Sequence, residues 1–154
     1  PERTLQIHGN LHFARCAGGC AGPVPLPEGL GEGIARDAVP DDATLAALRC
    51  ASCGGWLRPH VLWFDEYYDE ENYRAETALS ALAGAALLLV VGTSGATSLP
   101  ARMVEIALAQ AVSVVVVDPE PTSFAQRAVE DKGAFLRGTA CAVVPQVVAA
   151  LTAR

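Results

Sequence analysis

The sequence predicts an α/β protein, in which part of a parallel sheet carries helices on both faces and a small four-cysteine zinc-binding lobe is attached. The second half of the chain alternates aliphatic, β-branched runs with segments of helical periodicity, as parallel strands with crossover helices do. The first half is rich in Gly, Pro and Cys and has little periodicity. The pattern changes near Ala78.

Length and composition restrict the class of protein. A chain of 154 residues with 51% hydrophobic content holds one ordinary core plus a small lobe. Its net charge of -6, without clustered Lys and Arg, argues against a nucleic-acid partner and favours basic partners. No signal peptide is visible, and the apolar stretch 81–91 is too short to span a bilayer. We therefore expect a cytoplasmic protein with no membrane contact.

Four cysteines occur as two close pairs, Cys16 with Cys20 and Cys50 with Cys53. Each spacing places two thiolates on one turn, and two such turns supply the four ligands of a tetrahedral structural zinc ion. The intervening Pro/Gly-rich stretch 22–33 is typical of a loop excursion. Two disulfides are the alternative, and they need an oxidising compartment. Cys141, between two alanines, is predicted to be a small buried hydrophobe.

Periodicity and turn residues predict each element of the second half. Pro100 suits the first turn of a helix, and β-branched residues fill the run before Asp118. Before these elements, residues 11–14 alternate as a strand does, which makes His12 a surface residue rather than a ligand. The expected elements are strands at 85–91, 112–117 and 134–136 and helices at 100–110, 122–131 and 144–151.

Polar residues follow two of the predicted strands. In a Rossmann-like sheet, ligands bind beyond the carboxyl ends of the strands. Gly92, Thr93 and Ser94 offer backbone N–H groups and hydroxyls suited to a phosphate or ribose, although Gly and Ser also simply form turns. Asp118 can accept hydrogen bonds from both hydroxyls of an adenine ribose, and its alternative is an Asp-Pro turn or helix cap. Glu120 has a similar alternative as a first-turn acid.

These pieces, in this order, resemble the sirtuins, which are NAD-dependent protein deacylases. The resemblance spans almost the whole chain, and the combination of short motifs is more specific than any one of them. The matching segments are Ile7-His8-Gly9, the two cysteine pairs, Gly55 to Glu66, Val91-Gly92-Thr93-Ser94, and Asp118-Pro119-Glu120-Pro121-Thr122.

The resemblance implies a role for each segment. His8 would be the general base that activates a ribose hydroxyl of NAD after nicotinamide has left, and a neutral imidazole suits that step. The four cysteines would hold structural zinc remote from the reaction. An extended edge of Leu62, Trp63, Phe64, Asp65 and Glu66 would pair with an acyl-lysine peptide. Contacts to NAD would come from Gly92, Thr93, Ser94, Asp118, Glu120 and, through its backbone, Cys141.

The chain also departs from the family pattern. Asp65 stands where sirtuins usually have Gly, and the acidic residues 69–71 after it suit either a solvated loop or a surface for basic substrates. The glycine-rich pyrophosphate loop with which sirtuins begin does not occur, and the chain opens on Pro1 without Met. We expect the downstream part of a longer enzyme, weakly active alone, with the missing N-terminal segment as a second possible partner chain.

The expected organisation is a cleft segment at 1–15, a zinc lobe at 16–60 and the C-terminal part of the NAD-binding domain at 61–154. Trp56 and Trp63 are predicted as core anchors, while His60 is superfluous as a ligand once four cysteines are present. Two alternatives to the deacylase stay open. One is a non-catalytic zinc-containing protein-binding module, and the other is an NAD hydrolase of the sirtuin-like type.

Overall fold

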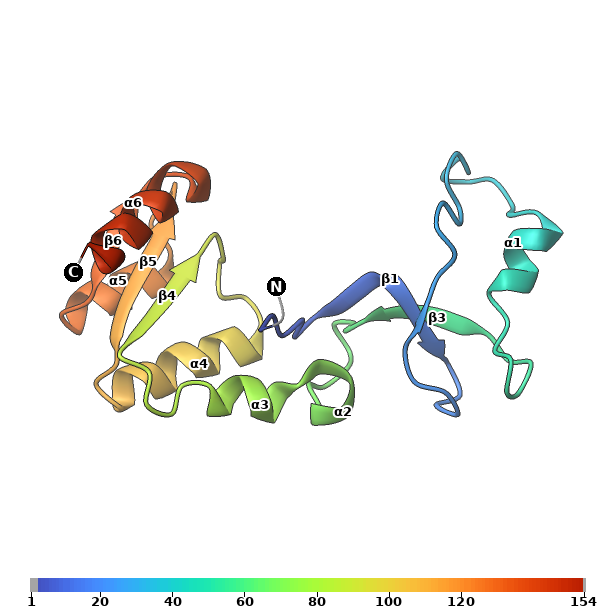
Figure 1. Cartoon of the computed structure of the whole chain (residues 1–154), viewed down its shortest axis with the longest axis horizontal. Helices are drawn as coiled ribbons and strands as arrows, with labels where there is room; N and C mark the ends of the chain where they lie inside the picture. Colours follow the sequence, from blue (N-terminus) through green and yellow to red (C-terminus); the bar gives the residue numbers. More distant parts are fainter. Residues whose placement is uncertain (1–2, 154) are drawn as a thin grey trace. The chain divides into compact units, whose positions relative to one another are not determined.

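The structure is a computed structural model that describes residues 3–153 and divides into two compact units, Pro1–Glu76 and Thr77–Arg154 (Figure 1). The division lies close to Ala78, where the sequence pattern changes. Within the described residues, no helix combines the length and the apolar character needed to cross a membrane.

The first unit is built on a three-stranded antiparallel sheet with the order β2-β1-β3. Its strands are β1 (Gly9–Cys16), β2 (Val24–Pro25) and β3 (Leu57–Val61). The predicted strand at 11–14 is confirmed and is longer than the alternation showed. The register pairs Gly9 with Val61 at one end and Cys16 with Leu57 at the other, with an irregularity between Asn10 and Ala14. The sheet therefore joins the segment around residue 9 to the cysteine turns.

Three short helices complete this part of the chain: α1 (Asp42–Ala47), α2 (Glu70–Tyr73) and α3 (Ala75–Ser80), the last of which crosses into the second unit. Asp41 caps α1 by accepting a hydrogen bond from the Thr44 backbone N–H at 2.8 Å, and hydrogen bonding from the side chain and backbone of Thr44 lowers the pKa of Asp41. Asp69 caps α2 in the same way.

The second unit confirms the predicted alternation of parallel strands and helices. Its strands β4 (Leu87–Val91), β5 (Ser113–Asp118) and β6 (Ala134–Arg137) pair in that order, all parallel. Its helices are α4 (Ser98–Ala109), α5 (Ser123–Glu130) and α6 (Ala140–Thr152).

Helix α6 begins four residues earlier than its periodicity predicted and contains Pro145. Proline is tolerated in the first turn of a helix, where its missing N–H group is not needed. Here it lies near the N-terminus, where the backbone N–H groups of Ala142 and Val143 already turn back to the Thr139 carbonyl. Downstream of the proline, the Gln146 side chain donates to the Ala142 carbonyl at 2.8 Å.

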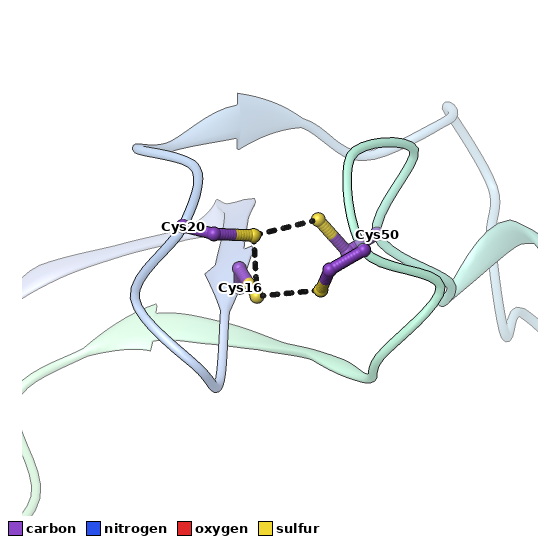
Figure 2. A group of neighbouring side chains, drawn as sticks. Cys16, Cys20 and Cys50 are labelled. Carbon is purple, nitrogen blue, oxygen red and sulfur yellow. Dashed lines mark hydrogen bonds between the residues drawn. The ribbon is translucent and has the colours of Figure 1, made fainter.

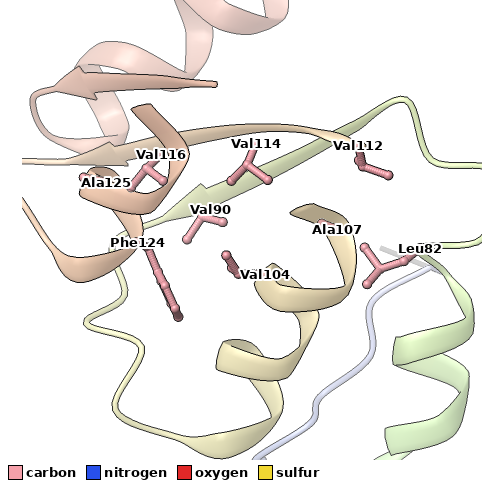
Figure 3. Packing of buried hydrophobic residues seen from close by; sticks show 10 residues of the cluster. Leu82, Val90, Val104, Ala107, Val112, Val114, Val116, Phe124 and Ala125 are labelled. Atoms are coloured by element: carbon pink, nitrogen blue, oxygen red, sulfur yellow. The ribbon is translucent and has the colours of Figure 1, made fainter. Parts of the chain in front are cut away.

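The core of the second unit lies between β5 and the helices α4 and α5 (Figure 3). Val114 and Val116, on one face of β5, pack in one buried cluster with Val104, Ala107, Phe124 and Ala125. Val117 points to the opposite face by strand alternation and is also fully buried, and α6 contacts β5. Helices therefore cover both faces of the sheet, as predicted.

Both edges of this sheet are left open within the described residues, because β4 and β6 each have one neighbouring strand. Strand β4 consists entirely of Leu and Val, and Val90 alone among its five residues is buried. Helix α6 is also strongly apolar, yet it contains no buried residue. Both elements therefore leave apolar side chains partly exposed, which is unusual in a parallel sheet.

Candidate functional site

The four cysteines predicted to bind zinc come together in the first unit (Figure 2). The sulfur of Cys20 lies 3.4 Å from that of Cys16 and 3.6 Å from that of Cys50, and the sulfurs of Cys16 and Cys53 are 3.6 Å apart. All four sulfurs lie within 4.8 Å of one another. Four thiolates at about 2.3 Å from a tetrahedral zinc ion are separated by about 3.8 Å, so the cluster fits a structural zinc site.

Two backbone turns at the ends of strands present these sulfurs. Cys16 ends β1, and the Gly19 N–H donates to the Cys16 carbonyl at 3.0 Å. In the second turn, the Gly54 N–H donates to the Cys50 carbonyl at 2.8 Å, with Gly54 in the left-handed conformation at φ +68°. The two turns are joined by a hydrogen bond from the Ala17 N–H to the Trp56 carbonyl at 2.9 Å.

Backbone N–H groups favour thiolates in this cluster. Hydrogen bonds from the Cys20 backbone and side chain lower the pKa of Cys16 to about 6. The backbone N–H groups of Cys53 and Ser52 lower the pKa of Cys50. Cys20 shares the remaining protons with its sulfur neighbours, first of all Cys53, which raises its pKa to about 12. Backbone hydrogen bonding therefore favours the thiolate form of Cys16 and Cys50, which is the form that binds a metal.

All five cysteines are free thiols, so the disulfide alternative has no counterpart in the structure. Four thiolates close a tetrahedral shell and leave no position for a substrate, which makes the centre structural rather than catalytic. The prediction that Cys141 is buried was wrong. Cys141 lies exposed in the first turn of α6, because the helix starts before it and turns its side chain to solvent.

His8 lies exposed directly before β1 on a well-fixed backbone. Its carbonyl accepts a hydrogen bond from the Leu62 N–H at 3.0 Å, and the Gly9 N–H donates to the Gln6 carbonyl at 2.8 Å. On its side chain, Nε2 lies 2.7 Å from the hydroxyl of Tyr68. The sheet therefore places His8 beside Leu62, the first residue of the predicted peptide-binding segment.

The segment predicted as an extended peptide-binding edge, 62–66, begins just after β3 with Leu62, whose N–H donates to the His8 carbonyl. After it the chain turns, and the Glu66 N–H donates to the Trp63 carbonyl at 3.1 Å. The Glu66 carboxylate explains this turn, because it also accepts the Trp63 N–H at 2.9 Å. Phe64 and Asp65, at the tip, are exposed to solvent.

Glu66 is the anchor of this turn. Its carboxylate receives two hydrogen bonds from the Arg58 guanidinium and forms an ion pair with Arg15 at 3.2 Å. The Arg58 hydrogen bonds lower the pKa of Glu66 to about 2, and the carboxylate in return raises the pKa of Arg58. Sequence analysis assigned Glu66 to the peptide edge and missed this role, since ion pairs between distant residues leave no local pattern.

Neither tryptophan is a core anchor, so that prediction was wrong. The exposed fractions of Trp56 and Trp63 are 45% and 49%, and each ring is instead covered by an arginine. The guanidinium carbon of Arg58 lies 3.9 Å from the centroid of the Trp63 ring, and that of Arg49 lies 3.3 Å from the Trp56 centroid. In both cases a cation covers one face of an indole that the fold leaves half exposed.

His60, left ambiguous by the sequence, is a buried residue of β3. It stacks on the buried Tyr73 with ring centroids 5.7 Å apart and an interplanar angle of 12°. Burial lowers the pKa of His60 and raises that of Tyr73, so both rings are held in their neutral forms. His60 is outside the cysteine cluster and belongs to the packing of the first unit.

The predicted nucleotide-binding residues lie at the carboxyl ends of the parallel strands of the second unit. Val91 pairs with Val117, so Gly92, just after β4, and Asp118, the last residue of β5, lie at the same edge of the sheet. The Thr93 hydroxyl accepts the Gly95 N–H at 3.3 Å and shapes the turn, while the Ser94 side chain is exposed.

At the end of β5, Asp118 accepts the Glu120 backbone N–H at 3.0 Å through one carboxylate oxygen. This is the Asp-Pro turn that stood as the alternative to ribose binding. Glu120 is exposed and paired with Arg137 at 3.1 Å, a contact the sequence did not suggest. Cys141 lies in the second unit as well, beyond β6.

Comparison with known proteins places the chain in a family. A sequence model described as the Sir2 family matches residues 2–98. The NAD-dependent protein deacylase 1 of Pseudomonas aeruginosa is 39% identical over 124 residues, which is 77% of this chain and 44% of that protein. A Leptospira interrogans NAD-dependent protein deacylase is 28% identical over 147 residues, which is 96% of this chain and 52% of that protein.

Solved structures show the same fold. A mutant Sir2 homologue in complex with ADP-ribose gives a TM-score of 0.71 at 24% identity, covering 97% of this chain and 54% of that one. The chain thus spans about half the length of the relatives it matches. The family model contains His8, both cysteine pairs and the turn at 62–66, and it reaches into the loop after β4. The chain belongs to the Sir2 family.

Proposed function

We propose that the intact protein containing this chain is an NAD-dependent protein lysine deacylase. It removes an acyl group from a lysine side chain and releases nicotinamide and acyl-ADP-ribose. The observation that carries this proposal is the Sir2 family match over residues 2–98, joined to relatives that are named NAD-dependent protein deacylases. NAD is the cosubstrate, and the four-cysteine centre is structural.

In this proposal His8 is the general base. Its ring is exposed on a fixed backbone, and with Nε2 in contact with Tyr68 its Nδ1 is the atom that accepts a proton from a ribose hydroxyl of NAD. The acyl-lysine peptide binds along Leu62, Trp63, Phe64, Asp65 and Glu66, which begin next to His8. Their support is the pairing of His8 with Leu62 and the solvent exposure of the turn that follows.

NAD is bound by Gly92, Thr93, Ser94, Asp118, Glu120 and the backbone of Cys141. The support is their position after the carboxyl ends of β4, β5 and β6, where ligands of parallel sheets bind. The Asp118 carboxylate has a second oxygen to accept a ribose hydroxyl while the first shapes the turn.

We further propose that a preceding family segment, on the same or a separate chain, completes this site. The open apolar edge of β4 and the largely exposed apolar helix α6 support this, as does the length of the relatives. The 154 residues alone then turn over little or no NAD. The cytoplasm is the proposed compartment, because free thiols poised to bind zinc need a reducing environment.

The test gives the intact protein NAD and an acetyl-lysine peptide and identifies the products by mass spectrometry. Acyl-ADP-ribose supports the deacylase, ADP-ribose alone supports an NAD hydrolase, and no turnover supports a protein-binding module. His8→Gln abolishes deacylation while leaving the unfolding midpoint and the zinc content unchanged. His12→Gln, an exposed histidine of β1, is the matched control and keeps full activity.

A further inference from the structure

We propose that Tyr68 is a positioning residue for His8, and this inference rests on the function proposed above. The Tyr68 hydroxyl lies 2.7 Å from Nε2 of His8, across 60 residues of sequence. The two rings also meet edge to face, with centroids 5.7 Å apart and an interplanar angle of 64°. One polar and one aromatic contact thus act on the same imidazole.

The imidazole needs such a partner because, within residues 3–153, no other side chain forms a hydrogen bond to its ring. The backbone of His8 is fixed by the Leu62 pairing, but the side chain is exposed. An exposed ring on a fixed backbone still rotates about its side-chain torsions. Within residues 3–153, Tyr68 is the side chain that hydrogen-bonds to that ring.

Tyr68 is itself held between two anchored points. On one side, Glu66 is tied to Arg58, Arg15 and the Trp63 N–H. On the other side, Asp69 caps α2 by accepting the Asn72 N–H. Tyr68 is therefore one of only two residues between the ion-paired Glu66 and the helix-capping Asp69, so its backbone is held at both ends. Its side chain is half-buried, unlike that of the neighbouring Tyr67, which is 91% exposed.

A hydrogen bond to one ring nitrogen sets the orientation of an imidazole and decides which nitrogen carries the proton. Bases that act on hydroxyl groups are commonly oriented by a third group in this way. When Nε2–H donates to the Tyr68 oxygen, Nδ1 keeps the lone pair that takes the ribose proton, and the ring is aligned before the substrate arrives. Tyr68 touches neither substrate nor reacting atoms in this role, so its effect is on the rate of the chemical step rather than on NAD affinity.

The first arm of the test is independent of catalysis. Aromatic ¹³C relaxation measures the mobility of the His8 ring, which is assigned among the three histidines with His8→Gln. The ring is restricted in the wild type and in Tyr67→Phe, more mobile in Tyr68→Phe, and most mobile in Tyr68→Leu, which also loses the aromatic contact. Equal ring mobility in all four proteins overturns the proposal.

The second arm measures deacylation by the intact protein. Tyr68→Phe lowers kcat about 10-fold with the KM for NAD changed less than about 2-fold, while Tyr67→Phe matches the wild type. An unchanged or raised kcat in Tyr68→Phe, in a protein that His8→Gln inactivates, overturns the inference and leaves the proposed function standing. If the wild type has no activity, the function fails and the relaxation arm alone decides whether Tyr68 orients the ring.

Discussion

The backbone of Gly9 lies so close to the main-chain carbonyl of His60 that a Cβ atom at residue 9 would overlap the carbonyl oxygen. Gly9 also has a φ of +81°, a conformation that other residues adopt with strain. It pairs with Val61 at the end of the β1–β3 ladder. The glycine thus lets the two strands close directly beside His8.

Replacement of Gly9 by Ala is therefore expected to destabilise the first unit by at least about 2 kcal/mol, since a left-handed backbone alone costs about 1–2 kcal/mol. Urea unfolding followed by tryptophan fluorescence measures the loss, because both tryptophans lie in this unit. Gly22→Ala is the control, as Gly22 has neither a positive φ nor an atom near its missing Cβ. Equal stability of the two variants would refute this packing argument.

The cysteine cluster predicts about one zinc ion per chain, measured by elemental analysis of carefully purified protein. Cys50→Ala removes a buried ligand and is expected to lose the metal and to unfold the lobe at lower denaturant concentration. Cys141→Ala, which removes the thiol outside the cluster, keeps the full zinc content. Retention of a full equivalent by Cys50→Ala would contradict the four-thiolate assignment.

The ion pairs of Glu66 predict a pH dependence of stability. The pKa of Glu66 is about 2 in the folded chain, below the ordinary value of 4.5, so the unfolded state binds more protons between these limits. The stabilisation is complete above about pH 4.5 and is lost as the pH falls towards 2. A carboxyl ¹³C titration checks this directly, and Arg58→Met is expected to return the Glu66 pKa towards its ordinary value.

At pH 7, Glu66→Gln is expected to cost about 2 kcal/mol in urea unfolding, since charge-assisted hydrogen bonds to Arg58 and the Trp63 N–H are lost. The control is Glu28→Gln, an exposed carboxylate for which the described residues show no ion pair. An equal loss of unfolding free energy in Glu66→Gln and Glu28→Gln would mean that the hydrogen bonds and ion pairs of Glu66 do not stabilise the fold.

Phe124 connects the core of the second unit with the loop after β4, because its ring fills the space beside the α-carbon of Gly95. Phe124→Ala is expected to cost about 3–5 kcal/mol in unfolding free energy and to weaken NAD binding by the intact protein, measured by calorimetry. Val129→Ala on the same helix, where the side chain is 58% exposed, changes both quantities little. Unaltered NAD affinity in Phe124→Ala would show that NAD binding does not depend on the packing of Phe124 against the loop after β4.

The sequence was most informative where the signal is local. Cysteine spacing predicted the metal cluster, and aliphatic runs such as 112–117 predicted the parallel strands, because both follow from nearest neighbours along the chain. The antiparallel sheet of the first unit was not predicted. Its strands pair residues 9–16 with residues 57–61, and that pairing depends on contacts between distant segments.

The environment of individual side chains was the least predictable feature. Trp63 was expected in the core and instead lies under Arg58, while Cys141 was expected to be buried and is exposed. Tyr68 carried no signal at all, since its contact with His8 depends on how the turn at 62–66 is folded. Each of these outcomes depends on the tertiary contacts around the residue, and the hydropathy and spacing of the sequence do not report those contacts.

The apolar edge of β4 has a practical consequence for work with these 154 residues. The outward-facing backbone groups of these five Leu and Val residues are unpaired within residues 3–153, so the edge is a template on which strands of other molecules can add. Preparations at high concentration will aggregate through this edge. Light scattering across a dilution series will detect the aggregation, and a lysine introduced at Leu87, the first residue of the strand, will suppress it.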